Sequence, residues 1–248
     1  LCRLTLKGTP GWGNACPGDF AMDFSGFKYL SFDCYGTLVD WENGILDALS
    51  GPFSDYRKVD PVEVLQAFAH HEAEVEAGEF LTYREVLTQV YSRICRQFGI
   101  DDSNQRRLAD SVACWVPFPD TKPALAKLSE RFKLVILSNV DEQMFARTEK
   151  SLGVPFFRVC TAERIGSYKP CPENFRFLIE ELGGDRSTIL HAAQSLFHDH
   201  VPARRSGLKT VWVNRASRLE GLGATPPAEA EPDFEVTSMS ELAELVLS

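Results

Sequence analysis

An aspartate follows the first strongly apolar segment of the chain. The segment FKYLSFD, residues 27–33, is rich in residues that favour strands, and it predicts a strand buried on both faces of a parallel sheet. Asp33 would stand at the carboxyl end of that strand, the edge where open α/β sheets bind ligands. Gly36 permits a tight turn there, and Thr37 offers a hydroxyl beside the carboxylate. Asp33 is therefore a candidate catalytic residue, and the plainer interpretation is an aspartate that only caps the turn.

The later part of the chain supplies the elements that would position this aspartate. Strand patterns there alternate with helical patterns, and such alternation is typical of a doubly wound parallel sheet in an α/β fold. The predicted strands are 134–138, 157–161, 189–193 and 210–214, and the predicted helices are 142–152, 172–182, 201–206 and 240–247.

The stretch between Trp41 and Val116 interrupts the alternation with three amphipathic helical patterns and no convincing strand. The first begins at Asp60 and Pro61, the second at Thr82 with a capping box to Glu85, and the third covers 104–115. We therefore expect an inserted all-helical cap domain at 41–116, set into an α/β core formed by 22–40 and 117–248. Residues 1–21 show no period and are left out of the fold as an expected leader or tail.

Bulk composition narrows the class of protein. A net charge of -9 argues against binding to nucleic acid or to an anionic membrane, because phosphate binding depends largely on lysine and arginine. The sequence contains no apolar run of the roughly 20 residues that a membrane span requires. Seven scattered cysteines without a CxxC pair indicate neither a disulfide framework nor a zinc site. A soluble, cytoplasmic protein is the expectation, and its acidity does not exclude a small anionic organic substrate.

Four motifs in order resemble those of the haloacid dehalogenase superfamily. They are FDCYGTLVD at 32–40, LSN at 137–139, YKP at 168–170 and the acidic Asp199 after the strand at 189–193. The resemblance extends through the core segments from residue 22 to the end. It implies a hydrolase in which Asp33 is a carboxylate nucleophile, with Ser138, Lys169 and Asp199 as further catalytic residues.

Tyr35, two residues after the nucleophile, indicates a branch of the superfamily. Phosphatases of this superfamily carry a second aspartate there, which protonates the departing alkoxide. A tyrosine, with a pKa of about 10, cannot do so at neutral pH, whereas a halide leaves without a proton. The form DxYGTL is similar to the L-2-haloacid dehalogenase branch, and so are KPCPENF, GGDRSTIL and SGLKTVWVNR.

The resemblance also implies roles for the residues around the nucleophile. Asp33 would displace halide from a small 2-haloacid, and water would hydrolyse the resulting aspartyl ester. Lys169 would keep Asp33 ionised, since an opposite charge nearby lowers a carboxylate pKa. Asp199 would hold Lys169 or the water. Neither a metal nor another cofactor is expected on this route. The implied substrate-binding residues are Tyr35, Thr37, Trp41, Asn139 and Ser195, together with Ser138.

The cap sequence departs from that pattern. Dehalogenases use an arginine on the first cap helix to cradle the halide, whereas the comparable stretch AFAHHEAEVEA contains none. The departure predicts either a different cradle, built from His70, His71 or Arg84, or a substrate that is not a simple haloacid. The glutamates of the same stretch are expected on a solvated face. Phe175 and 194–196 also differ from the family residues, which are a tyrosine and a Ser-x-Asn pair.

Two other classes of function stay open. A magnesium-dependent phosphatase on this fold would use Asp33 and Asp199 as metal ligands, although it lacks the second aspartate. A non-catalytic binding protein would not require Asp33, Ser138, Lys169 and Asp199 together. The segment HDH at 198–200 is weak as a metal cluster, because it offers no third ligand nearby. Family likeness alone suggests a homodimer.

Overall fold

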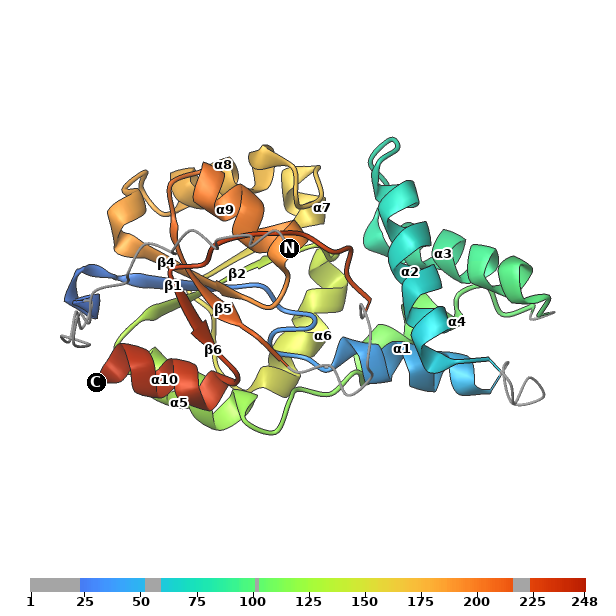
Figure 1. Cartoon of the computed structure of the whole chain (residues 1–248), viewed down its shortest axis with the longest axis horizontal. Coiled ribbons are helices and arrows are strands. Elements are labelled where there is room, and N and C mark those ends of the chain that lie inside the picture. The colour runs from blue at the N-terminus through green and yellow to red at the C-terminus, as the bar shows by residue number, and fades with distance from the viewer. Residues whose placement is uncertain (1–22, 52–58, 101–102, 216–223) are drawn as a thin grey trace, which may run out of the picture.

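Within the described residues, 23–51, 59–100, 103–215 and 224–248 of a computed structural model, six parallel strands form one sheet (Figure 1). Their order is β3-β2-β1-β4-β5-β6, so β1 lies between β2 and β4 at the point where the chain order reverses. Ligands bind near such a switch point. The strands are β1 Tyr29–Phe32, β2 Lys133–Ser138, β3 Arg158–Thr161, β4 Ile189–Ala193, β5 Lys209–Val213 and β6 Phe234–Val236. The five predicted strands and the fold class are confirmed, and β6 was not predicted.

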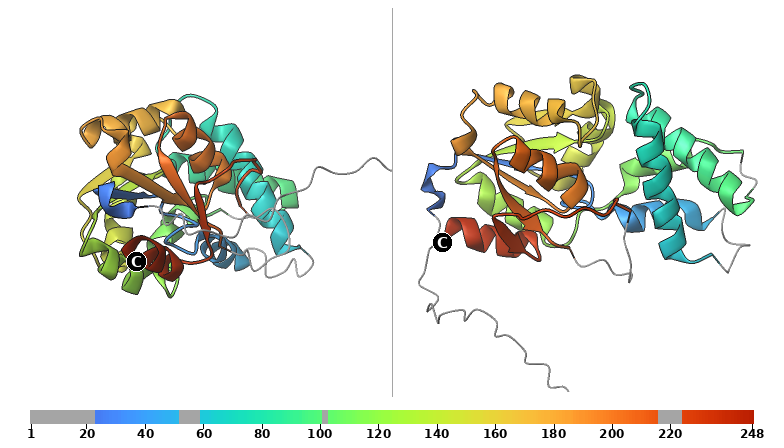
Figure 2. Two further views of the ribbon diagram at one scale, coloured as in Figure 1. Left: turned by 60° about the vertical axis from the view of Figure 1, so that its left-hand side comes forward. Right: turned by 45° about the horizontal axis from the view of Figure 1, so that its top comes forward.

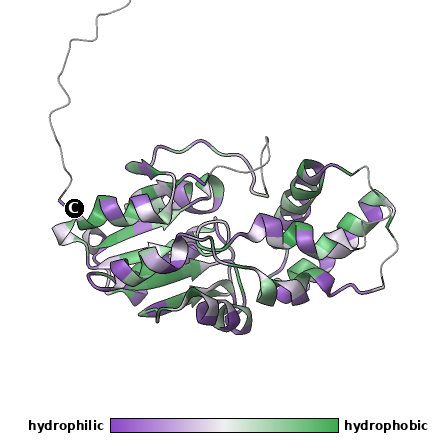
Figure 3. Ribbon diagram, turned by 90° about the horizontal axis from the view of Figure 1, so that it is seen from below, coloured by the Kyte–Doolittle hydropathy of each residue, from purple (hydrophilic) through white to green (hydrophobic). Residues whose placement is uncertain are grey.

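Side chains of the central strands alternate between two apolar cores, one on each face of the sheet. In β2, Leu134 and Ile136 enter the larger core, and Val135 and Leu137 enter the smaller one. Figure 3 colours the strands largely as hydrophobic. A strand buried on both faces has no polar side, which explains why these segments appear in the sequence as continuous apolar runs.

Helices cover both faces of the sheet, as a doubly wound fold requires (Figures 1 and 2). The helix predicted at 142–152 is confirmed, and Gly153 ends it in the left-handed conformation with φ 78°. One face carries α5 Thr121–Ser129, α6 Glu142–Leu152 and α10 Met239–Leu247, and the other carries α7 Ala162–Ile165, α8 Pro172–Glu181 and α9 Val201–Arg205. Short 3-10 helices occur at Phe24–Gly26 and Arg186–Thr188, and a π-helical turn occurs at Leu196–His200.

A separate group of helices stands beside the sheet, at the right of Figure 1, and forms the cap. Two of the three predicted helices begin at their predicted caps: Asp60 caps α2 Pro61–Glu76, and the Thr82–Glu85 capping box precedes α3 Tyr83–Phe98. The third, predicted at 104–115, is shorter: α4 Arg107–Ser111 continues as a 3-10 turn at Val112–Cys114. The division of the chain at residues 41 and 116 stays a prediction, and residues 1–21 lie outside the described residues.

The cap also contains a helix that the sequence did not suggest, α1 Trp41–Ser50. Gly44 inside it weakens the helical pattern, because glycine disfavours helix interiors. The structure gives the reason for this glycine: a Cβ at position 44 would lie 2.3 Å from the Trp115 ring. Close packing of α1 against Trp115 therefore requires a residue without a side chain.

No helix in the described parts of the chain combines the length and apolar character needed to cross a membrane. Cys34, Cys114, Cys160 and Cys171 are free thiols, the first and third buried and the other two exposed.

Candidate active site

Asp33 leaves the carboxyl end of β1 and is 7% exposed. Its backbone N–H donates to the Ala192 carbonyl of β4 at 3.2 Å, which extends the strand pairing to the site itself. The chain then turns at Gly36, whose φ of 93° favours glycine, and the turn brings Thr37 back beside the carboxylate. The Thr37 hydroxyl donates to Asp33 Oδ2 at 2.7 Å and accepts from the Gln194 N–H at 2.9 Å. The turn thus places the Thr37 hydroxyl where it fixes one oxygen of the Asp33 carboxylate.

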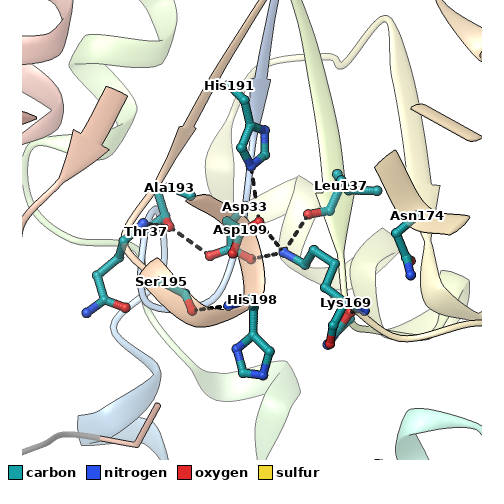
Figure 4. Close-up of polar contacts among 12 residues, drawn as sticks. Asp33, Thr37, Leu137, Lys169, Asn174, His191, Ala193, Ser195, His198 and Asp199 are labelled. Carbon is teal, nitrogen blue, oxygen red and sulfur yellow. Dashed lines mark hydrogen bonds and ion pairs between the residues drawn. The ribbon is translucent and has the colours of Figure 1, made fainter. Parts of the chain in front are cut away.

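Lys169 lies across from Asp33 and is 2% exposed. Its Nζ donates to Asp33 Oδ1 at 2.9 Å, to Asp199 Oδ1 at 2.8 Å and to the Leu137 carbonyl at 3.1 Å (Figure 4). These bonds use all three N–H groups of the ammonium. Lys169 therefore links three elements, β1, β2 and the turn after β4, at one point.

Asn139 holds the main chain at Lys169. The Lys169 N–H donates to Asn139 Oδ1 at 2.7 Å, and Asn139 Nδ2 donates to the Lys169 carbonyl at 3.0 Å. This pair of bonds fixes the loop that carries the ammonium. Asn139, predicted to bind the substrate, lines the cleft while binding that loop.

Charge and burial act in opposite directions on this trio. Burial raises the pKa of Asp33, and the Lys169 ammonium opposes that shift. Although burial favours neutral lysine, Asp199 and Asp33 together raise the pKa of Lys169 above its usual value. Burial also disfavours the charged form of Asp199, but Lys169 and His191 bring its pKa well below the usual value. The ammonium is therefore the group that stabilises both carboxylates.

A second chain of contacts supports Asp199 from behind. His191 of β4 is fully buried, and its Nε2 lies 3.1 Å from Asp199 Oδ1, while its Nδ1 lies 2.9 Å from the Ser31 hydroxyl. Because a carboxylate only accepts, Nε2 carries the hydrogen of this contact. Phe175 packs edge-on against the ring at 5.3 Å. Sequence reasoning missed His191, although a histidine inside the apolar strand ILHAA is the informative kind of buried polar residue.

A cleft opens above this trio, between the carboxyl edge of the sheet and the cap. Most of the predicted site residues line it, and Thr37 lies one bond behind Asp33. The Ser138 hydroxyl, on a residue that is 2% exposed, is buried without a hydrogen-bond partner among the residues that the structure describes. Such an oxygen at a cleft is suited to bind a ligand, because an unsatisfied buried polar group costs free energy. The lining residues are Asp33, Tyr35, Trp41, Glu72, Tyr83, Ser138, Asn139, Lys169, Ser195, His198, Asp199 and Thr225.

The structure does not bring His70 to the cleft, so its predicted place at the substrate is wrong. Its side chain is 64% exposed and pairs with Glu74 at 3.4 Å. The physical reason is helical periodicity: Phe68 and Glu72, one turn apart, face inward, and His70 lies about 200° from Glu72 around α2. His71 bonds Gln97 on α3, and Arg84 pairs with Asp110, so neither lines the cleft.

Glu72 overturns the expectation that the cap glutamates lie on a solvated face. It is 5% exposed, lines the cleft and accepts a hydrogen bond from the Tyr83 hydroxyl at 2.7 Å. Glu74, two residues on, is half exposed as expected. The sequence could have indicated this, because Glu72 continues the apolar face of Leu65 and Phe68 at i+7 and i+4.

The Tyr35 phenol is turned away from the nucleophile. Its hydroxyl lies 2.8 Å from the Thr148 hydroxyl of α6, and its ring meets Trp115 edge-on at 5.6 Å. Burial raises the pKa of Tyr35 well above its usual value. Tyr35 is therefore held as a neutral packing group, with its hydroxyl bonded to α6.

Asp33 and Asp199 are the residues whose carboxylate oxygens would bind a magnesium ion. Three of their four carboxylate oxygens accept bonds from Lys169, Thr37 or His191, and Asp199 Oδ2 is buried with no partner in the described part of the chain. Magnesium is bound by one or two carboxylates with several waters, so this orphan oxygen is compatible with a metal ligand.

The HDH segment does not form a metal cluster. His200 Nε2 binds the Ala193 carbonyl and Asp199 binds Lys169, while His198 lines the cleft, where burial lowers its pKa to about 4. Within the described residues, donor atoms converge only at His70, His71 and Glu74 on the cap, where Arg93 already pairs with Glu74 at 2.9 Å.

An α/β fold with a carboxylate, a serine, a lysine and a second carboxylate at one sheet edge defines the class of hydrolases that the sequence motifs resemble. Residues 27–192 match the family model described as haloacid dehalogenase-like hydrolase. The match covers more than half of the chain, so the chain belongs to this family and is a hydrolase of the haloacid dehalogenase superfamily. No curated protein matches.

Solved structures agree with the fold. The chain is similar to a defluorinating L-2-haloacid dehalogenase, Rha0230, with 23% identity, a TM-score of 0.75 and coverage of 90% of this chain and 96% of that one. The L-2-haloacid dehalogenase from Xanthobacter autotrophicus gives 23% identity, a TM-score of 0.75 and coverage of 90% and 99%. A putative hydrolase of this superfamily from Bacillus subtilis, YfnB, bound to magnesium, gives 19% identity, a TM-score of 0.71 and coverage of 90% of this chain and 99% of that one. At these identities the likeness concerns the fold.

Proposed function

We propose that this hydrolase cleaves the carbon–halogen bond of a small 2-haloacid, with Asp33 as the nucleophile. The single observation that carries the proposal is the pairing of Asp33 with the Lys169 ammonium at 2.9 Å beneath the cleft. The neighbouring phenol of Tyr35 forms its hydrogen bond with Thr148. That arrangement holds a carboxylate ready to attack and offers no aspartate two residues on to protonate an alkoxide. A leaving group that departs as an anion suits such a site.

The reaction would take two steps. In the first, Asp33 attacks the carbon that bears the halogen, a carbon–oxygen bond forms, and the halogen leaves with the electron pair as halide. In the second, water attacks the Asp33 carbonyl, the ester bond breaks, and the 2-hydroxy acid departs as Asp33 is regenerated with one proton released. Lys169 stabilises the carboxylate before and after each turnover, because it stays within bonding distance of Asp33.

Binding of the substrate carboxylate would fall to Ser138. Its buried hydroxyl has no partner within the described ranges, and it lies at the end of β2, beside the strand that carries Asp33. A carboxylate bound there would gain a hydrogen bond and would lie near the Lys169 ammonium. Asp199, which accepts from Lys169 and His191, would keep that ammonium in place, and its unpartnered oxygen is a candidate contact for the hydrolytic water.

A magnesium-dependent phosphatase is the second candidate. The unpartnered Asp199 Oδ2 favours it, and so does the fold likeness to a superfamily member described as bound to magnesium. It would need an acid for the departing alkoxide, and Tyr35 cannot serve because its pKa lies above the usual value of about 10.

A substrate panel tests the proposal. The full chain is incubated with 2-haloacids and with phosphomonoesters, with added magnesium or with EDTA, and released halide and phosphate are measured. The proposal expects halide release that is indifferent to EDTA and absent in Asp33→Asn. Phosphate release that requires magnesium, without halide release, would replace it by the second candidate.

A further inference from the structure

The direction of attack assigns a task to the cap. Displacement at carbon is in-line, so the leaving group departs on the side opposite to the attacking oxygen. Asp33 forms the floor of the cleft, on the sheet edge, and the leaving group must therefore face the opposite wall. That wall is the cap, which contributes Trp41 from α1, Glu72 from α2 and Tyr83 from α3.

Glu72 is the carboxyl group on this wall. The Tyr83 hydroxyl donates to Glu72 Oε1 at 2.7 Å, and this hydrogen bond fixes the orientation of the carboxyl group. Burial raises the pKa of Glu72 to about 8, with the Tyr83 hydrogen bond acting in the opposite direction. At neutral pH the group is then mostly the neutral acid, which has one O–H to donate.

We propose that the carboxylic acid of Glu72, oriented by Tyr83, donates a hydrogen bond to the departing halide and takes the part that an arginine plays in the dehalogenases. The inference rests on the proposed function and deepens it, because it names the leaving-group contact. A donor aimed at the place where negative charge develops stabilises the transition state more than the ground state. Carbon–halogen cleavage needs no proton transfer, so the hydrogen stays on Glu72.

The surroundings of Glu72 support a neutral acid. Glu76 lies on the same helix, burial raises its pKa well above the usual value, and its Oε1 has no partner within the described residues. Tyr83 from α3 and Tyr168 from the loop before α8 both have pKa values raised by burial and are neutral. Across the cleft stand the Lys169 ammonium and the neutral His198. Trp41, from α1, does not titrate.

The sign of the pH dependence follows. Below about pH 8 Glu72 carries its proton and donates; above it the carboxylate has no hydrogen to offer and repels the halide. Activity should therefore fall as pH rises through the pKa of Glu72. In Glu72→Gln the amide donates at every pH, so this alkaline fall should disappear.

The kinetic test compares three variants with 2-chloropropionate between pH 6 and 10. Glu72→Leu should lower kcat by about 10²-fold at pH 7, the usual loss for one transition-state donor, whereas Glu72→Gln should stay within about threefold. Glu74→Leu, on the exposed side of the same helix, is the matched control and should behave as the wild type. Melting temperatures report whether Glu72→Leu is folded. Equal kcat in wild type and a folded Glu72→Leu, or an alkaline fall that persists in Glu72→Gln, would overturn the inference.

A binding test is independent of turnover. If the wild type released no halide, the proposed function would be refuted, and bromide binding would still test the role of Glu72. Sodium bromide is titrated at constant ionic strength while tryptophan fluorescence is recorded, because Trp41 lines the cleft. Saturable quenching should appear in the wild type at pH 6.5, and the affinity for bromide should be at least about tenfold lower at pH 9.5. In Glu72→Gln the quenching should persist at both pH values. It should be lost in Glu72→Leu and in the reporter control Trp41→Phe. Saturable binding of equal strength in Glu72→Leu and wild type would contradict the assignment.

Discussion

The floor and the wall of the cleft are built differently. On the floor, Asp33 comes from the end of β1, Lys169 from the loop before α8 and Asp199 from the turn after β4, and bonds of 2.8–2.9 Å hold them together. On the wall, Glu72 and Tyr83 share one hydrogen bond, and α2, which carries Glu72, contains no arginine. The floor is the part that the family motifs describe, and the wall is the part in which this chain departs from them.

The difference separates two tasks. A nucleophile needs a fixed charge balance, which a buried ammonium between two carboxylates supplies, and its parts cannot be exchanged singly because each leaves an unpaired buried charge. The wall needs only to fit a leaving group, and one side chain can change that fit. We therefore expect single substitutions on the floor to lower activity more than single substitutions on the wall.

Asp33→Asn should give the largest effect. The amide keeps the shape of the carboxylate and loses its nucleophilicity, so halide release should fall by at least about 10³-fold. Initial rates of halide release measure this, with circular dichroism as the check on folding. A well-folded variant with more than about a tenth of wild-type activity would remove Asp33 from the chemistry.

Lys169→Met should come next and should affect both rate and stability. It leaves Asp33 and Asp199 facing each other without a cation, which costs about 3–5 kcal/mol of unfolding free energy. Halide release should fall by about 10²-fold or more. Urea unfolding and initial rates measure the two effects, with Lys150→Met on the exposed side of α6 as control. A loss of less than about 1 kcal/mol would contradict the charge balance described for the floor.

His191→Leu should have a smaller effect, exerted through Asp199. The change removes a hydrogen bond to a charged group, worth about 1.5–3 kcal/mol, and leaves the Ser31 hydroxyl with the Leu190 carbonyl alone. A positioning role predicts a drop in kcat of about tenfold with little change in KM. If only stability changed, His191 would be a structural residue and not a positioning one.

Tyr35→Phe should have the smallest effect of the series. It removes one hydrogen bond to Thr148, worth about 0.5–1.5 kcal/mol of stability, and touches no group assigned to the reaction. Halide release should stay within about twofold of the wild type. A large loss of activity with normal folding would make the phenol a participant and would reopen the question of which acid the site uses.

Much of the fold could be predicted from the sequence because its signals are local. Doubly buried strands appear as apolar runs, and the capping residues Asp60 and Thr82 fix where two cap helices begin. The missed elements have weak local signals. Helix α1 contains Gly44, which only the distant Trp115 explains, and β6 has three residues at the edge of the sheet.

The floor residues lie in short motifs that follow one another in order along the chain, and that is why the sequence could propose them together. The wall depends on which side of a helix faces inward, a tertiary property. The sequence places Glu72 in an acidic run and offers His70 as a polar residue of the cap, yet α2 turns the first inward and the second outward. His191 was missed because its partners, Ser31 and Asp199, come from different segments.

The most direct test of the central claim is a single turnover in water enriched in ¹⁸O, with enzyme in excess over 2-chloropropionate. The account predicts that the hydroxyl oxygen of the product comes from the Asp33 carboxylate, so mass spectrometry should find ¹⁸O in the peptide that contains Asp33 and unlabelled product. Label in the product, with none in that peptide, would show direct attack by water and would contradict a nucleophilic Asp33.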